Sequence, residues 1–174
     1  MAEQIIKVLE FHRVKNVGLK FSGSKGFHLV VPWKSFPKEI NEVKTSIMFP
    51  EWPRIVLQYI NEKVHPMLVR EITKLSTSNK YVKDYKASEE VIPDLVLVSS
   101  RHLFRMPYSL HEKTSLASVV LDPKKISEFE LKDAEPMKVE VKDFIPYSEE
   151  GEASELLMQA LDWYKENAPD EEEE

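Results

Sequence analysis

The chain has 174 residues, of which 42% are hydrophobic and 31% charged, the balance expected of one globular domain with its own core. Five acids occupy positions 170–174, and subtracting them from the net charge of −6 leaves −1 for the rest. The absence of cysteine excludes disulfides, thiolate zinc sites and a cysteine nucleophile. No apolar run approaches the ~20 residues that span a bilayer, and the first residues lack a signal-peptide pattern. We therefore expect a cytoplasmic protein without a membrane segment.

The first part of the chain predicts a helix followed by two short strands. Apolar residues three and four apart favour an amphipathic helix over 3–15, with Gly18 as part of its stop signal. Residues 19–21 and 27–31 are expected to be extended. The link between them, 22–26, holds two of the chain's four glycines, which indicates a backbone conformation that other residues avoid.

The remaining elements are shorter, apart from one long helix. That helix is expected over 52–75, and Pro66 should kink or divide it. Strands are expected at 95–98, 117–121 and 137–141, with helices at 38–43, 99–105, 123–129 and 152–167. The mixture favours an α+β fold, with a mixed or antiparallel sheet and flanking helices, in a single domain over 1–168. The acidic tail at 169–174 is expected to be disordered.

The first segment with chemical potential is Ser-Gly-Ser-Lys-Gly-Phe-His at 22–28. Strand alternation puts Phe27 and Leu29 on one face and His28 on the other. A turn rich in backbone N–H groups, hydroxyls and a lysine can form a concavity that binds anions such as polyphosphates. It is not a P-loop, because the Gly-Lys-Ser/Thr ending and the following helix are absent. An ordinary hairpin with a solvated lysine would produce the same pattern.

The second segment is a basic stretch at 99–114. Its basic side chains are Arg101, His102, Arg105, His111 and Lys113. Residues 1–34 hold six Lys/Arg against two Glu, so two positive segments occur in a chain that is otherwise neutral to acidic. They predict a local positive field for a ligand that carries phosphate. The alternative is a solvated basic loop that balances acids elsewhere.

The third feature is Asp94, which precedes the apolar run at 95–98. A carboxylate at the edge of a buried strand can hold a hard cation such as Mg²⁺ or Mn²⁺, although a simple loop aspartate explains it as well. The five histidines show no zinc-site spacing on a helix, so we expect no zinc.

Taken together, the three segments resemble the archaeo-eukaryotic primase superfamily, in its small catalytic subunit branch. Residues 21–28 resemble the family's Ser-Gly-(basic or small)-basic-Gly-x-His motif. Residues 105–114, Arg-Met-Pro-Tyr-Ser-Leu-His-Glu-Lys-Thr, resemble its basic-x-Pro-x-Ser-Leu-His-x-Lys-Thr segment. Asp94 stands 11 residues before Arg105, close to the place of the family's third-motif aspartate.

The resemblance implies a primase-like fold that binds nucleoside triphosphate for primer synthesis on a single-stranded nucleic-acid template. It implies contacts with the triphosphate for Ser22, Ser24, Lys25, His28, Arg105 and His111. Asp94 would be the catalytic ligand of Mg²⁺ or Mn²⁺. The chemistry agrees with the residues, since cations and donors would surround the phosphate charge.

The sequence departs from the family at its first motif, a pair of aspartates one residue apart upstream of the glycine turn. The 21 residues before Ser22 contain only the acids Glu3 and Glu10. Two-metal phosphoryl transfer needs several carboxylates. We therefore expect the carboxy-terminal part of a catalytic domain, which needs a second protein chain or a missing segment for catalysis. The alternatives are a non-catalytic nucleotide- or nucleic-acid-binding module derived from a primase, and a purely structural protein.

Overall fold

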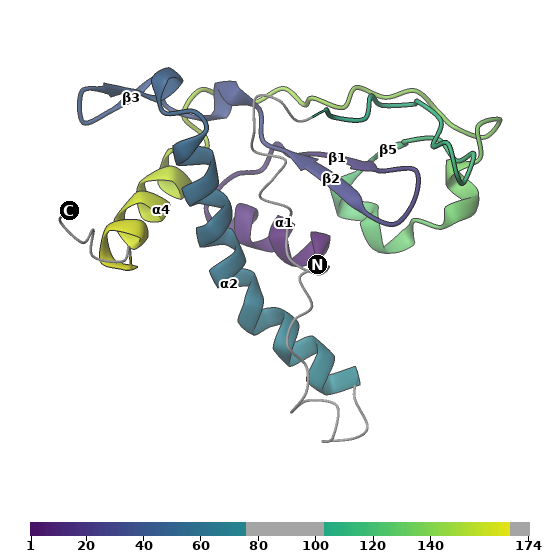
Figure 1. Cartoon of the computed structure of the whole chain (residues 1–174), viewed down its shortest axis with the longest axis horizontal. Coiled ribbons are helices and arrows are strands. Elements are labelled where there is room, and N and C mark those ends of the chain that lie inside the picture. Colours follow the sequence, from purple (N-terminus) through teal and green to yellow (C-terminus); the bar gives the residue numbers. More distant parts are fainter. Residues whose placement is uncertain (76–102, 168–174) are drawn as a thin grey trace, which may run out of the picture.

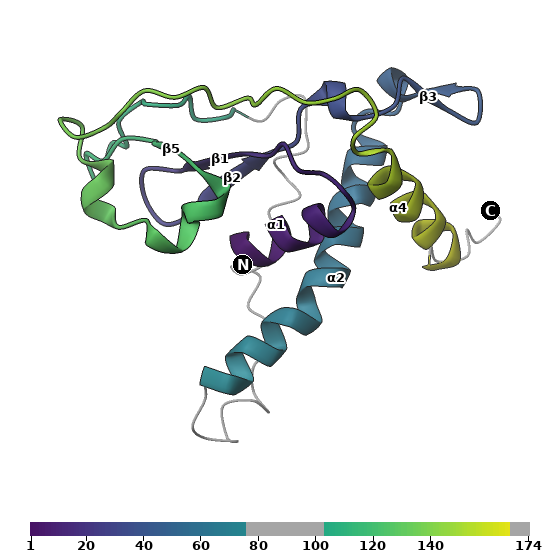
Figure 2. The same cartoon turned by 180° about the vertical axis from the view of Figure 1, so that it is seen from behind.

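The computed structural model describes residues 1–75 and 103–167, and Figures 1 and 2 show it from opposite sides. The predicted strand at 95–98, Asp94 and the acidic tail lie outside the described residues. The helices are α1 (Ala2–Phe11), α2 (Glu51–Leu75) and α4 (Ser154–Asn167). The strands are β1 (Gly18–Phe21), β2 (Phe27–Val30), β3 (Glu39–Ile40), β4 (Val43–Lys44) and β5 (Val120–Leu121). Antiparallel sheets with flanking helices confirm the predicted α+β class.

The larger sheet has the strand order β2-β1-β5, and both pairings are antiparallel. Lys20 is paired with His28, and Phe21 with Phe27. Because directly paired residues share a face, Lys20 and His28 lie on one side of the sheet and the two phenylalanines on the other. This register confirms the predicted alternation along β2.

Two apolar clusters hold the fold together. The larger one joins α1, α2 and α4, and Leu29 of β2 packs against it. The smaller one lies on the phenylalanine side of the sheet, where Phe21, Phe27 and Phe129 pack with ring centroids 5.0–5.9 Å apart. The sheet is therefore anchored from its apolar face, and Lys20 and His28 lie on the opposite face. Within the described residues, no helix is long and apolar enough to cross a membrane.

Helix α1 ends at Phe11, four residues before the predicted end. Arg13 takes a left-handed conformation (φ 66°). Its N–H donates to the Glu10 carbonyl, and the N–H of Val14 donates to the Leu9 carbonyl. This is the Schellman pattern, usually made with glycine. The predicted stop signal lay too far along because arginine occupies the left-handed position.

A buried polar group links the three helices. The His12 ring is 1% exposed, and its Nε2 lies 3.0 Å from the Tyr59 hydroxyl of α2 and 3.1 Å from Gln159 Oε1 of α4. The Tyr59 hydroxyl also donates to Gln159 Oε1. Burial and the nearby Glu155 raise the pKa of Tyr59, so the phenol stays protonated and can donate.

Three element predictions were wrong. Residues 38–43 form no helix, because Asn41 and Glu42 both take positive φ and close a tight β3–β4 hairpin. Of the two outcomes predicted for Pro66, a kink or a division of the helix, division is excluded, because α2 continues through the proline. Residues 137–141 form no strand; Met137 and Val141 are 96% and 82% exposed, so their alternation has no sheet to join. The described part of the helix predicted at 99–105, from residue 103 onward, is not helical.

Candidate functional site

The turn at 22–26 closes on its own hydroxyl. Ser22 N–H donates to the Gly26 carbonyl at 2.8 Å, and the backbone N–H groups of Ser24 and Gly26 donate to Ser22 Oγ at 3.3 and 3.2 Å. Gly23 takes a φ of +90°, which confirms the strained backbone predicted for this link. Gly26 has no positive φ and no neighbour within 4 Å of an added Cβ. Of the two glycines in the turn, Gly23 is therefore the one that the local structure requires. The turn therefore directs two backbone N–H groups toward the hydroxyl oxygen of Ser22.

The loop from Arg105 to Ser118 folds back on itself. Leu110 forms an isolated bridge with Ala117, and His111 N–H donates to the Leu116 carbonyl at 2.9 Å. Pro107 lies in a turn that ends at Ser109, whose Oγ donates to the Met106 carbonyl. This turn separates Arg105 from His111, which lie on opposite arms of the loop.

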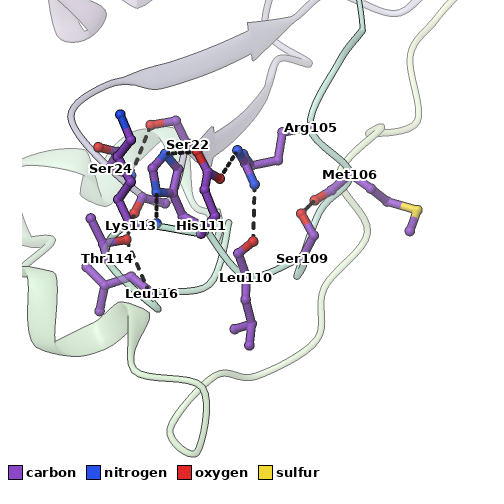
Figure 3. Close-up of polar contacts among 12 residues, drawn as sticks. Ser22, Ser24, Arg105, Met106, Ser109, Leu110, His111, Lys113, Thr114 and Leu116 are labelled. Atoms are coloured by element: carbon purple, nitrogen blue, oxygen red, sulfur yellow. Dashed lines mark hydrogen bonds and ion pairs between the residues drawn. The ribbon is translucent and has the colours of Figure 1, made fainter.

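The turn and the loop meet at Gly23. A Cβ on Gly23 would lie 2.9 Å from the Cβ of His111 and 3.3 Å from the Leu116 carbonyl. Thr114 Oγ1 donates to the Gly23 carbonyl across 91 residues of sequence. Figure 3 shows His111 beside Ser22 and Ser24 of the turn, with Arg105 on its other side. The structure thus brings together two motif segments that are far apart in the chain.

Arg105 is held on the loop by two partners. Its Nη1 donates to the Leu110 carbonyl at 3.1 Å, and its Nη2 pairs with Glu112 Oε2 at 2.9 Å (Figure 3). The other Glu112 oxygen lies 3.8 Å from His111 Nε2. Hydrogen bonds from its own backbone N–H and from Arg105 lower the pKa of Glu112. A carboxylate therefore lies between the side chains of Arg105 and His111.

The other predicted residues lie around this junction. The His28 ring on β2 packs against Phe104, with centroids 4.9 Å apart, which places it on the side of the loop that carries Arg105. Lys25 is exposed at the tip of the turn, and Ser22 and Ser24 are half-buried. All six residues predicted to contact the triphosphate come from the turn, its following strand and the loop packed against it.

A comparison with known protein families found a match that covers both segments. A family model described as DNA primase small subunit matches residues 1–123, which include both the turn and the loop. The chain belongs to the DNA primase small subunit family. Comparisons with curated proteins and with solved structures found no match.

Membership of the primase small subunit family confirms the resemblance and gives the chain a primase-like function in DNA replication. Primase small subunits as a family take nucleoside triphosphates and nucleic acid and work with a large subunit. The match extends through β5 and ends at Pro123, so α4 lies beyond it.

Sequence reasoning counted Lys20 of this primase-family chain only toward the net charge. The structure buries it completely, with Nζ 2.9 Å from Ser118 Oγ and 4.5 Å from the centroid of the Phe104 ring. Burial, followed by repulsion from Arg105, lowers the pKa of Lys20 to about 8. Its position opposite His28 in the strand register was the signal that could have found it.

The residues of this site are basic or hydroxyl-bearing, apart from Glu112. Such donors match phosphate oxygens rather than a divalent cation. In the described ranges, no group of three or more His, Asp or Glu side chains lies close enough to hold a metal ion. The predicted metal ligand Asp94 lies outside these ranges.

Proposed function

We propose that the chain binds a nucleoside triphosphate where the glycine turn and the basic loop meet, as the nucleotide-binding part of a primase-like nucleotidyltransferase. Ser22, Ser24, Lys25 and His28 would contact the phosphates from the turn and β2, and Arg105 and His111 from the loop. The observation that carries this proposal is the packing of His111 and Thr114 onto Gly23. This packing supports the proposal because it brings the turn and the loop, whose side chains would contact the phosphates, to one place.

A divalent cation belongs to this proposal through Asp94. Mg²⁺ or Mn²⁺ would be held by that carboxylate and by oxygens of the triphosphate, and it would neutralise phosphate charge when bound. Further carboxylates would come from a preceding segment or from a second chain, since Glu3 and Glu10 lie exposed on α1. With those carboxylates, the chain would add nucleotides to a primer on a single-stranded template.

Calorimetric titration with ATP tests this function. We expect saturable one-site binding that strengthens when Mg²⁺ or Mn²⁺ is added, and primer synthesis once a carboxylate-bearing partner chain is included. An absence of ATP binding in every metal condition would contradict the proposal.

A second candidate is a non-catalytic binding module that keeps the phosphate site. The ion pair of Arg105 with Glu112 favours it, because the carboxylate partly neutralises the positive charge of the site without a metal. Binding of ATP that is the same in the presence of a chelator, together with no primer synthesis in any combination of chains, would support this candidate over the first.

Replacing Glu112 by glutamine should tighten the binding of inorganic triphosphate up to about fivefold, measured without divalent metal. The carboxylate competes with phosphate for Arg105, and because an exposed ion pair is weak the gain should be small. Glu166→Gln on α4 makes the same change of charge at an exposed position outside the matched segment and should leave the affinity unchanged. Unchanged or weaker binding by Glu112→Gln would show that Glu112 does not compete.

A further inference from the structure

Lys20 is a buried cation on the face of the sheet that also carries His28, one of the residues of the proposed phosphate site. It is 0% exposed in the middle of β1, and its ammonium lies 4.5 Å from the centroid of Phe104 and 5.8 Å from that of Phe144. Within residues 1–75 and 103–167, its ammonium has one hydrogen-bond partner, Ser118 Oγ, and no carboxylate. A buried ammonium is costly unless something compensates its charge. An anion bound in front of it would supply that compensation.

Ser118 connects this cation to the loop. Its Oγ accepts from Lys20 and donates to the Phe21 carbonyl at 2.8 Å. Its backbone N–H donates to the Ser109 carbonyl, and its own carbonyl accepts from Tyr108 N–H at 2.7 Å. The hydroxyl of Ser118 is therefore bonded to β1, and its backbone is bonded to the loop that carries Arg105 and His111. A change at Lys20 would reach these groups through a single buried residue.

Charged and aromatic groups surround Lys20 from several elements. His28 is opposite it on β2, and Arg105 repels it from the loop. Strand β5 contributes the apolar Val120, and the segment at 142–144 contributes the Phe144 ring, flanked by the exposed Lys142 and Asp143. Figures 1 and 2 both show this segment running alongside the start of the loop, and the Tyr108 hydroxyl donates to the Lys142 carbonyl at 2.8 Å. The ammonium is thus enclosed on the face of the sheet where the phosphate site lies.

We propose that Lys20 is a positioning residue for the phosphate site: its ammonium, fixed by Ser118, aligns the loop that carries Arg105 and His111 and attracts a polyphosphate from behind the site wall. This inference rests on the proposed function. Bound phosphate favours the charged amine, so binding near pH 8 should draw a proton onto Lys20. Above pH 8 the amine of the free protein is mostly neutral, because its pKa is lowered to about 8. The affinity for polyphosphate should therefore fall as the pH rises through 8.

The test uses inorganic triphosphate as the probe and calorimetry between pH 7 and 9.5. The wild-type chain should lose about tenfold in affinity across this range, and it should take up a proton at pH 8 when two buffers of different ionisation enthalpy are compared. Lys20→Met, which keeps an unbranched side chain only one atom shorter and removes the charge, should bind about tenfold more weakly at pH 7 and show no extra loss at pH 9.5. Its Tm should be equal or higher, since a buried charge has been removed. A merely structural lysine would not produce this pH profile.

Ser118→Ala serves as the second variant, because it keeps the charge of Lys20 and removes the hydroxyl that links Lys20 to the loop. We expect weaker binding with the pH dependence retained. Lys20→Met with wild-type affinity at every pH, or a wild-type chain with no proton uptake, would overturn the inference while leaving the proposed function intact. Failure of the wild-type chain to bind triphosphate at pH 7 would instead overturn the proposed function itself.

Discussion

Gly23→Ala should destabilise the chain by about 2–4 kcal/mol and remove triphosphate binding. Two costs combine here. The φ of +90° strains any residue with a Cβ, and the new Cβ would lie 2.9 Å from the Cβ of His111. Overpacking against a closely fitted neighbour adds about 1–3 kcal/mol. The turn and the loop would have to separate, which would dismantle the site.

Gly26→Ala is the matched control, since it makes the same chemical change three positions away. The backbone there is not left-handed, and an added Cβ would meet nothing within 4 Å. Its effect should stay within about 0.5 kcal/mol. Urea denaturation of the two variants and the wild type measures the difference. Equal stabilities of Gly23→Ala and Gly26→Ala would contradict the close packing of His111 on the turn.

Arg105→Ala should weaken the binding of ATP by about 10- to 100-fold. A guanidinium on phosphate makes charge-assisted hydrogen bonds, each contributing about 1.5–3 kcal/mol, and it matches phosphate geometry in a way that an ammonium does not. Arg105→Lys should therefore recover only part of the affinity. The bond from Arg105 Nη1 to the Leu110 carbonyl is exposed, so the variant should remain folded.

Lys165→Ala on α4 controls for the loss of one positive charge. This lysine is 71% exposed and paired with Asp162. It belongs to α4, which Figure 1 shows on the opposite side of the molecule from the loop. Calorimetry on the three variants compares a local effect with a general one. If Arg105→Ala and Lys165→Ala bind ATP equally well, Arg105 plays no part in the site.

Local sequence patterns predicted the parts of the site but not their meeting. Alternation along β2 placed His28 opposite the apolar face, and the two glycines marked the turn, because both signals depend on a few neighbouring residues. The contact of Thr114 with Gly23 spans 91 residues, so periodicity carries no information about it. Only the family resemblance joined the two segments before the structure did.

The errors also have physical causes. Residues 38–43 have a composition that a helix tolerates, but left-handed Asn41 and Glu42 close a hairpin instead. Alternation at 137–141 predicted a strand, yet a strand exists only where a partner edge is available. No local pattern marked Lys20, which was counted only toward the net charge, whereas the fold buries it under Phe104. Burial of this kind depends on tertiary packing rather than on local propensity.

The most direct test of the shared site is an NMR titration of the isotopically labelled chain with ATP. The backbone amides of Ser24 and Gly26 in the turn and those of residues 111–116 in the loop should shift together, with one dissociation constant fitting both groups. Shifts confined to one of the two segments, or two different constants, would contradict a single phosphate-binding site built from the turn and the loop.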